Sequence, residues 1–427
     1  MQPLVAPLTA AEATDAARFG PKAANLALLA QAGLSTPGGF CVDAQAYRIQ
    51  VRALGLESAM RDIDSHEPGV ARRAALDMKL GLLDRPIVPE VAEPLLAAWR
   101  EMVARTGART AVRSSALVED RFGSSFAGQF ESYLGLEDEA EFITAVRSCW
   151  AALWSTRVLR YMATHDASPA ETAMAVLVQP LVEARVSGGG LSRTAEDEMV
   201  LNATWGMGSQ IAQGEVVPER IVLTRECKLR EAALGRKYRA VGCVHMGGPG
   251  AAKPLFAQRC LADEQAIELG RMLLEVERLM DMPVEIEWAL DDAGIKLLQG
   301  RPLHVQQTSV PDEIWRHPGG QHGLTGHPAG VGWSSGRARV VNCECELSLV
   351  GPGEILVTRV AGPALSQILP RVAGVVAELG GSTSHLASLA RERGIPMVLG
   401  VLDATERIPN GAQVAVDGVA GVVRWMQ

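Results

Sequence analysis

A histidine follows a glycine-rich turn and opens a predicted helix near the end of this 427-residue chain. The segment runs Leu379-Gly-Gly-Ser-Thr-Ser-His385, after a strand-like apolar stretch. A serine or threonine at this position can accept hydrogen bonds from the first N–H groups of the helix. A helix N-terminus favours anions and a neutral imidazole. His385 is therefore a candidate nucleophile that could carry a phosphoryl group. The spacing by itself rather favours an ordinary histidine at a helix start.

A second group of polar residues begins where a predicted strand ends at Arg113. A loop rich in glycine and serine follows, over residues 119–129. Glycine lets backbone N–H groups approach phosphate oxygens, and an arginine can bind them through two parallel hydrogen bonds. Many such loops are simple turns, so this stretch alone does not establish a phosphate site.

Two short predicted strands near residue 290 carry acidic and polar side chains. Glu285 and Glu287 share one face of the first strand, because side chains two apart point the same way. The turn at 291–294 is typical of a hairpin, which would place Gln299 and Arg301 beside them. Carboxylate and amide oxygens can hold Mg²⁺ at a triphosphate, and an arginine can neutralise a phosphoryl group in transfer. An edge hairpin with solvated charges would show the same pattern.

The composition is that of an ordinary globular protein, and the length predicts two or three domains. The net charge of −8 argues against a nucleic-acid binder that is held by phosphate contacts. Apolar stretches end before the ~18 residues of a membrane span, and we find no signal peptide at the N-terminus.

The seven cysteines form no CxxC pair, which favours a cytoplasmic protein with unlinked thiols. Cys343 and Cys345 are spaced poorly for a metal or redox site.

Residues 317–332 predict a linker or hinge, because six glycines and two prolines fall within sixteen positions. Its three histidines leave metal binding as an alternative. Apolar periodicity before the linker predicts helices at 23–33, 91–106, 142–161 and 261–280, and strands at 40–42, 110–113, 174–181, 284–289 and 295–298. The region after it predicts one compact α/β domain, with a helix at 383–393 and strands at 354–358, 372–378, 396–399, 413–416 and 421–425.

Several motifs, in this order, resemble the dikinase or PEP-utilising phosphotransferase family, which includes pyruvate phosphate dikinase, phosphoenolpyruvate synthase and rifampin phosphotransferase. The segments are GPKAANL at 20–26, PGGFCV at 37–42, AVRSSA at 111–116, SFAGQ at 125–129 and IEWA…LQGRP at 286–302. The stretch GGSTSHLASLARERGIPMVLG at 380–400 is similar to the phosphohistidine domain of the same family. Each piece is weak, but the ordered combination is specific. Leu386 and Ser388 replace the usual alanine and isoleucine.

The resemblance implies an α/β and α+β multidomain protein. An ATP-grasp nucleotide-binding domain would cover residues 1–310, and a hinge linker residues 311–335. A small swivelling α/β phosphohistidine domain would cover residues 336–427.

The resemblance also implies roles for particular residues. Lys22 and Arg113 would contact the phosphates of ATP, under a loop that contains Gly123, Ser124, Ser125 and Gly128. Gln179 and Leu181 would line the adenine pocket. Glu287 and Gln299 would hold Mg²⁺, Arg301 would stabilise the transferring group, and His385 would be the catalytic histidine.

The implied reaction is the phosphorylation of His385 by ATP, with release of AMP and phosphate. Phospho-His385 would then pass its phosphoryl group to a small-molecule acceptor in a cleft between the domains. Two alternatives stay open. The chain could hand the group to a separate acceptor-domain protein, or it could be an ATP-grasp ligase or kinase that releases ADP. No nucleic-acid or membrane partner is expected.

Overall fold

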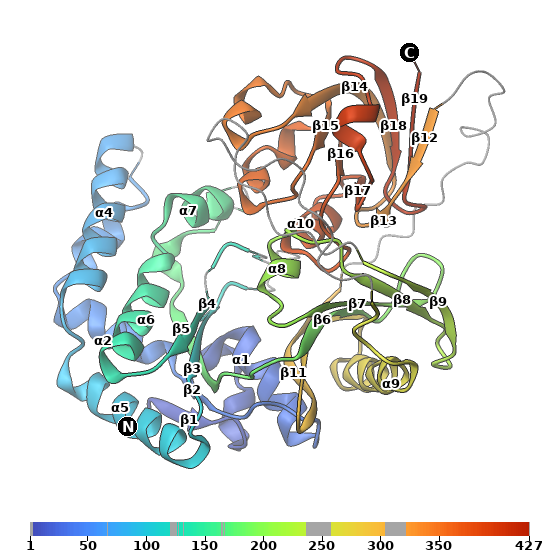
Figure 1. Cartoon of the computed structure of the whole chain (residues 1–427). Coiled ribbons are helices and arrows are strands. Elements are labelled where there is room, and N and C mark those ends of the chain that lie inside the picture. The colour runs from blue at the N-terminus through green and yellow to red at the C-terminus, as the bar shows by residue number, and fades with distance from the viewer. Residues whose placement is uncertain are drawn as a thin grey trace. The chain divides into compact units, whose positions relative to one another are not determined.

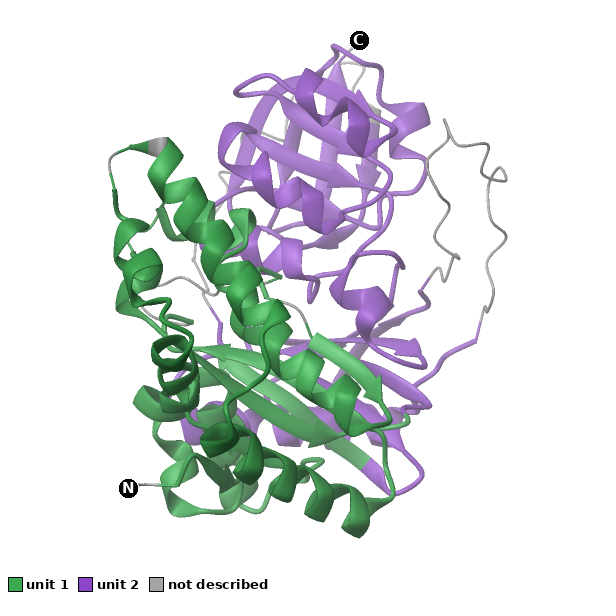
Figure 2. Cartoon of the chain, turned by 90° about the vertical axis from the view of Figure 1, so that its left-hand side faces the viewer, with its two compact units in different colours: residues 1–183, 295–301 green, residues 184–294, 302–427 purple. Residues whose placement is uncertain are grey.

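The computed structural model describes residues 3–65, 67–119, 126, 128–130, 132–163, 165, 167–235, 258–303 and 322–426. The chain forms two compact units (Figure 2): residues 1–183 with 295–301, and residues 184–294 with 302–427. The chain contains helices and the strands of three sheets, and this confirms the expected α/β and α+β multidomain class. No helix within the described ranges is long and apolar enough to cross a membrane.

The first unit is built on a five-stranded antiparallel sheet (Figure 1). The strands, in spatial order, are β1 (Val5–Pro7), β2 (Phe40–Val42), β5 (Met174–Pro180), β3 (Thr110–Ala116) and β4 (Ser132–Leu136). Around them lie α1 (Ala16–Gln31), α2 (Ala44–Ala53), α3 (Glu57–Asp62), α4 (Pro68–Asp84), α5 (Pro89–Thr106), α6 (Glu139–Ala152) and α7 (Thr156–Ala163), with the 3-10 turns η1 (Ala11–Thr14) and η2 (Pro169–Glu171). Strand β5 is buried along its whole length, because α1 and α6 both pack on β3 and β5.

The single helix predicted over residues 142–161 is wrong, because the structure has two helices there, α6 and α7. The apolar periodicity continues across the break, but the hydroxyl of Ser155 accepts a hydrogen bond from the N–H of Val158 at 3.3 Å. A serine in this position caps a new helix. Trp154, at the break, is buried and donates its indole N–H to the hydroxyl of Tyr47 at 2.9 Å.

The second unit contains an antiparallel sheet and a mixed sheet. In the first, neighbouring strands follow the order β10 (Val284–Asp291), β6 (Val186–Leu191), β7 (Met199–Trp205), β8 (Glu219–Leu223) and β9 (Leu229–Ala233). Helix α9 (Asp263–Met280) packs on β7, β8 and β10 (Figure 1), and α8 (Ser209–Ala212) is a single turn. Strand β11 (Gly294–Pro302) follows β10, and residues 295–301 belong to the first unit.

The eight-stranded mixed sheet forms the α/β domain predicted at the end of the chain. Its strands, in spatial order, are β12 (His322–Thr325), β19 (Val422–Met426), β18 (Gln413–Asp417), β14 (Trp333–Val341), β15 (Ile355–Thr358), β16 (Gly374–Ala377), β17 (Met397–Leu399) and β13 (His327–Pro328). Its helices are α10 (His385–Glu392) and α11 (Ala404–Arg407), with 3-10 turns η5 (Glu344–Leu349), η6 (Pro363–Gln367) and η7 (Leu369–Arg371). β14 to β17 are parallel to one another, and the outer pairs are antiparallel.

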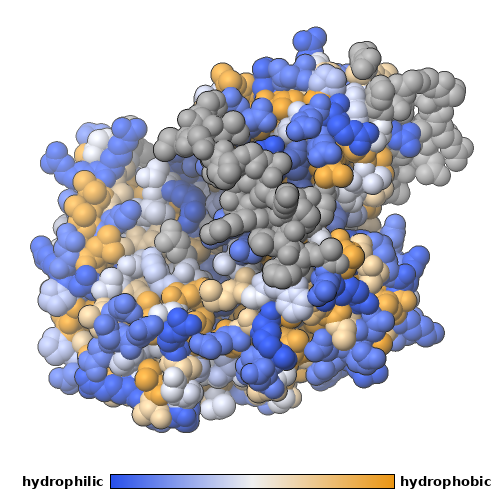
Figure 3. Space-filling view, in the orientation of Figure 1, coloured by the Kyte–Doolittle hydropathy of each residue, from blue (hydrophilic) through white to orange (hydrophobic). Residues whose placement is uncertain are grey.

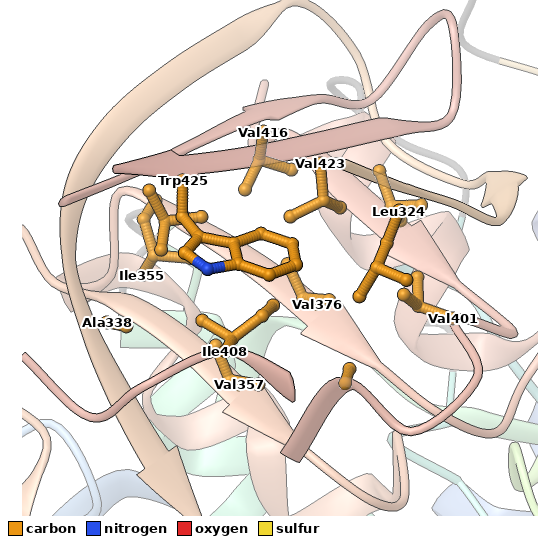
Figure 4. Close-up of a cluster of buried hydrophobic side chains, with 13 residues drawn as sticks. Leu324, Ala338, Ile355, Val357, Val376, Val401, Ile408, Val416, Val423 and Trp425 are labelled. Carbon is orange, nitrogen blue, oxygen red and sulfur yellow. The ribbon is translucent and has the colours of Figure 1, made fainter. Parts of the chain in front are cut away.

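An apolar cluster holds this sheet together. Trp425 lies among aliphatic side chains from several strands and beside Ile408, which follows α11 (Figure 4). Ile355, Val357 and Val376 have no exposed surface. Burying one such side chain contributes about 1.5–3 kcal/mol. At the edge of the cluster, hydrogen bonds from Arg339 hold the pKa of Glu354 below its usual value.

Part of the predicted linker belongs to this sheet. Residues 322–325 pair with β19, and residues 327–328 pair with β17. Leu324 is buried in the apolar cluster, and the N–H of Gly326 donates to the carbonyl of Gly421 at 2.9 Å. The composition predicted a linker because these strands pair with segments about seventy to a hundred residues later, and no local sequence pattern shows such pairing. Residues 304–321 lie outside the described residues.

The structure also corrects the prediction of unlinked thiols. Cys343 and Cys345 are joined in a disulfide, with their Cα atoms 5.2 Å apart at the start of η5. That separation lies within the range that disulfides span, although the two residues are only two apart in sequence. Elsewhere in the described chain, Cys41, Cys149, Cys227 and Cys260 take part in no disulfide, and burial raises the pKa of Cys41 to about 12.

Hydrophobic side chains on the surface are dispersed. The face that Figure 3 shows has orange residues scattered among blue ones. Exposed large apolar residues include Leu76, Met207, Leu349 and Leu402, which come from four separate segments. Single exposed apolar residues of this kind are normal on globular proteins.

Candidate functional site

Helix α1 places Lys22 against strand β3. The ammonium group of Lys22 donates to the carbonyl of Ser114 at 2.8 Å and lies 3.4 Å from a carboxylate oxygen of Glu119. Ser114 follows Arg113, so the structure brings the two predicted phosphate-binding residues to adjacent elements. The approach needs a glycine at position 20, where a Cβ would lie 2.3 Å from the carbonyl oxygen of Ser115. Gly20 also has a φ of 74°, which favours glycine.

The same helix fixes strand β11. The amide of Asn25 donates to the carbonyl of Gly300 at 3.1 Å. Asn25 lies three residues after Lys22 and so shares its helix face. Gly300 lies between Gln299, which is half-buried, and Arg301, which is buried. Within the first unit, α1 therefore contacts both the strand of Arg113 and the strand of Arg301. The contact of Asn25 with Gly300 was not predicted from the sequence.

Gln179 lies on β5, opposite Ala111 of β3, and is 2% exposed. Its side-chain N–H group has no hydrogen-bond partner within the described part of the chain. An unsatisfied buried donor costs about 1–3 kcal/mol, so a ligand acceptor here would be stabilising. Leu181 follows β5 and donates its backbone N–H to the carbonyl of Arg109 at 2.7 Å. The role of both residues in an adenine pocket stays a prediction.

The predicted phosphate-covering loop is described only at its end. Gly123, Ser124 and Ser125 lie outside the described residues. Gly128 has a φ of 66°, a conformation that favours glycine. The following carbonyl, of Gln129, accepts a hydrogen bond from Arg157 of α7 at 2.8 Å, which anchors the end of the loop.

The structure confirms the two predicted strands around residue 290, β10 and β11. Between them, the carboxylate of Asp291 accepts a hydrogen bond from the N–H of Ala293 at 2.8 Å, as is common in tight turns. Glu287 on β10 belongs to the second unit, whereas Gln299 and Arg301 on β11 belong to the first. Their joint action on one metal ion stays a prediction.

His385 lies in the first turn of α10, as the sequence predicted, although the helix begins at His385 itself and not at residue 383. His385 is partly exposed. The hydroxyl of Ser384 accepts a hydrogen bond from the N–H of Ala387 at 3.3 Å and so caps the helix. The turn before it uses Gly380 at a φ of 109°. This places the imidazole at the positive end of the helix dipole, which favours an anionic group there.

The loop before His385 rests on the antiparallel sheet of the second unit. The side-chain oxygen of Asn202, on β7, accepts hydrogen bonds from the hydroxyls of Ser382 at 2.9 Å and Thr383 at 3.1 Å. Glu285, on β10, accepts one from Arg391 of α10 at 3.1 Å. Asn202 was not predicted, because no local sequence pattern marks it. Glu285 was predicted only to share a strand face with Glu287.

Two protein-family models match the parts of the chain that contain these residues. The family model of the pyruvate phosphate dikinase AMP/ATP-binding domain matches residues 16–317, and that of the PEP-utilising enzyme mobile domain matches residues 350–421. Fold and site therefore define a nucleotide-binding protein with a histidine-bearing α/β domain. The chain belongs to the pyruvate phosphate dikinase family, with an AMP/ATP-binding domain followed by a PEP-utilising mobile domain.

Curated relatives agree with this assignment. A phosphoenolpyruvate synthase of Aeropyrum pernix is 32% identical over 95% of this chain and 56% of its own length. That of Pyrococcus furiosus is 30% identical over 96% and 57%. The chain thus spans little more than half the length of these relatives. Among solved structures, the aconitase X of Thermococcus kodakaraensis matches 25% of this chain and 99% of its own length at 21% identity, with a TM-score of 0.21.

Proposed function

We propose that this chain is a dikinase-type phosphotransferase. ATP phosphorylates His385, AMP and phosphate leave, and phospho-His385 passes its phosphoryl group to a small-molecule acceptor. The observation that carries the proposal is the position of His385. It opens a capped helix within the mobile-domain match, in the same chain as an AMP/ATP-binding domain.

The first step forms an N–P bond between the imidazole and the β-phosphorus of ATP. The bond from that phosphorus to the oxygen bridging it to the α-phosphorus breaks, and AMP leaves. Water then takes the γ-phosphoryl group as phosphate. Lys22 and Arg113 hold phosphate oxygens, Gln179 and Leu181 hold the adenine, and Arg301 offsets the negative charge on the transferring group.

Mg²⁺ is part of the proposal. Within the described residues, no three His, Cys, Asp or Glu side chains form a cluster that could hold a metal. Mg²⁺ usually binds through one or two carboxylates together with substrate phosphates. Glu287 and Gln299 would supply the protein oxygens. The metal would neutralise charge on the β- and γ-phosphates.

The acceptor and the location of the reaction rest on the sequence alone. A small-molecule acceptor is the partner that we propose, with transfer to a separate acceptor-domain protein as the alternative. Neither a nucleic acid nor a membrane is needed. The cytoplasmic location stays a prediction.

Labelling with β-³²P-ATP and Mg²⁺ tests the proposal, because only a dikinase leaves the β-phosphoryl group on the protein. We expect an acid-labile, base-stable label together with AMP, both lost in His385→Ala. The matched control is His165→Ala, which changes a histidine of the nucleotide-binding domain and should label normally. A wild-type protein that stays unlabelled and releases ADP with candidate substrates would instead be an ATP-grasp ligase or kinase.

A further inference from the structure

The helix that carries His385 is attached to the second unit's antiparallel sheet by a buried polar cluster. Arg391 donates to the carboxylate of Glu285 at 3.1 Å, and the hydroxyl of Ser388 donates to the same carboxylate at 3.0 Å. The side chains of Arg391 and Glu285 are 9% and 6% exposed. Arg391 also donates to the carbonyl of Ser382 at 2.6 Å, which ties the loop before His385 to the cluster.

The register of the sheet shows where this loop lies. Glu287 of β10 pairs with Gly189 of β6, and Gly189 pairs with Asn202 of β7. Directly paired residues lie on one face, about 4.5–5.5 Å apart between Cα atoms. Thr383 donates to Asn202, and a Cβ on Gly189 would lie 2.6 Å from the Cβ of Thr383. The loop therefore lies over Gly189 and Asn202, which belong to the same row of paired residues as Glu287.

Glu285 shares that face, because it lies two residues from Glu287 on the same strand. Its partner Ser388 lies one helical turn after His385. The carboxylate that holds α10 and the carboxylate expected at the magnesium ion are thus neighbours on β10. This arrangement holds α10 against the strand that carries the expected metal ligand.

We propose that Glu285, Ser388 and Arg391 form a docking latch that positions His385 for phosphorylation by ATP. The inference rests on the proposed function, since it assigns the latch to the charging step. Glu285, Ser388 and Arg391 are positioning residues, and none of them touches the reacting atoms.

An ion pair suits a contact that must form and break in each cycle. Desolvation of two charges offsets most of their attraction when they are buried together, and both regain water when they separate. The ion pair therefore determines the docked position of α10 but adds little net free energy to docking. Leaving one charge buried without the other is strongly unfavourable, so the latch closes only when both partners are present. Ser388, which replaces the family's usual isoleucine, adds a hydrogen bond to the same carboxylate.

The test is the rate of His385 labelling by β-³²P-ATP in a single turnover of the full chain. We expect Glu285→Gln and Arg391→Met each to slow labelling about ten- to hundredfold. The affinity for a non-hydrolysable ATP analogue and the hydrolysis rate of isolated phospho-His385 should not change. Arg391→Lys should recover part of the rate. The control is Arg407→Met, which removes an exposed arginine of the same domain and should label at the wild-type rate.

A double variant separates a latch from general damage. If the two residues act as a pair, Glu285→Gln combined with Arg391→Met should be no slower than the slower single variant. Additive losses, or wild-type rates in both single variants, would overturn the latch. If Arg391→Met fails to fold, the labelling rate of Glu285→Gln alone tests the latch. The Glu285→Gln variant keeps the hydrogen bond from Arg391 to the carbonyl of Ser382. An unlabelled wild-type protein would contradict the proposed function itself.

Discussion

Lys22 shows how one side chain at the candidate nucleotide site is held by the protein. Its ammonium group donates to the carbonyl of Ser114 and lies near the carboxylate of Glu119, which is 4% exposed. An ammonium group has three donors, so one can remain for a phosphate oxygen.

We therefore expect Lys22→Gln to raise the dissociation constant for ATP about ten- to hundredfold, because a charge-assisted hydrogen bond to phosphate is lost. Isothermal titration calorimetry with a non-hydrolysable ATP analogue measures this. Lys79→Gln, which changes an exposed lysine on α4, is the control and should bind normally. Equal affinity of the Lys22 variant and the wild type would remove Lys22 from the site.

Strand β6 shows how an element can be shaped for a contact. It carries three consecutive glycines, Gly188 to Gly190, although glycine weakens a strand interior. The reason is steric at Gly189, where a side chain would collide with Thr383. On the other face, the atoms nearest to a Cβ on Gly190 would be side-chain atoms, Cδ2 of Leu201 at 3.0 Å and Cγ1 of Ile286 at 3.2 Å.

Gly189→Ala should therefore slow the phosphorylation of His385 at least about tenfold, because the added methyl group displaces the docked loop. Gly190→Ala is the matched control, with the same chemical change on the opposite face. Rapid-quench labelling with β-³²P-ATP, with thermal unfolding of both variants, measures the effect. Similar rates in the two variants would mean that the close approach of Thr383 has no role in charging.

At the scale of the whole molecule, the mobile domain must travel if one histidine serves both ATP and a separate acceptor. The sequence predicted that the glycine-rich residues 317–332 form the hinge. Residues 322–328 instead belong to the domain's own sheet, so glycines there have structural roles. A Cβ on Gly326 would lie 2.4 Å from the carbonyl oxygen of Leu399.

Proline substitutions distinguish sheet from hinge. Gly326→Pro should destabilise the domain by about 3 kcal/mol, because it removes the hydrogen bond to Gly421 and adds a clash. Thermal denaturation followed by circular dichroism measures this. Gly319→Pro combined with Gly320→Pro should slow turnover and leave both stability and ATP affinity unchanged. Unchanged turnover in that double variant would count against a hinge at these positions.

The amino-acid sequence by itself determined the residue types that could do the chemistry and most of the elements that carry them. His385 at a helix start, and the strands around Arg113, Gln179 and Glu287, follow from local patterns, because caps, glycine turns and apolar alternation act over a few residues. The order of short motifs indicated the family.

Only the tertiary structure decided which distant residues meet. Asn25 contacts Gly300 across 275 residues, and Glu285 contacts Arg391 across 106. The glycine-rich segment at 322–328 became strand for the same reason, since its partners β17 and β19 lie about seventy to a hundred residues later. Long-range pairing and burial override local preference, and they leave no trace in the composition of either segment.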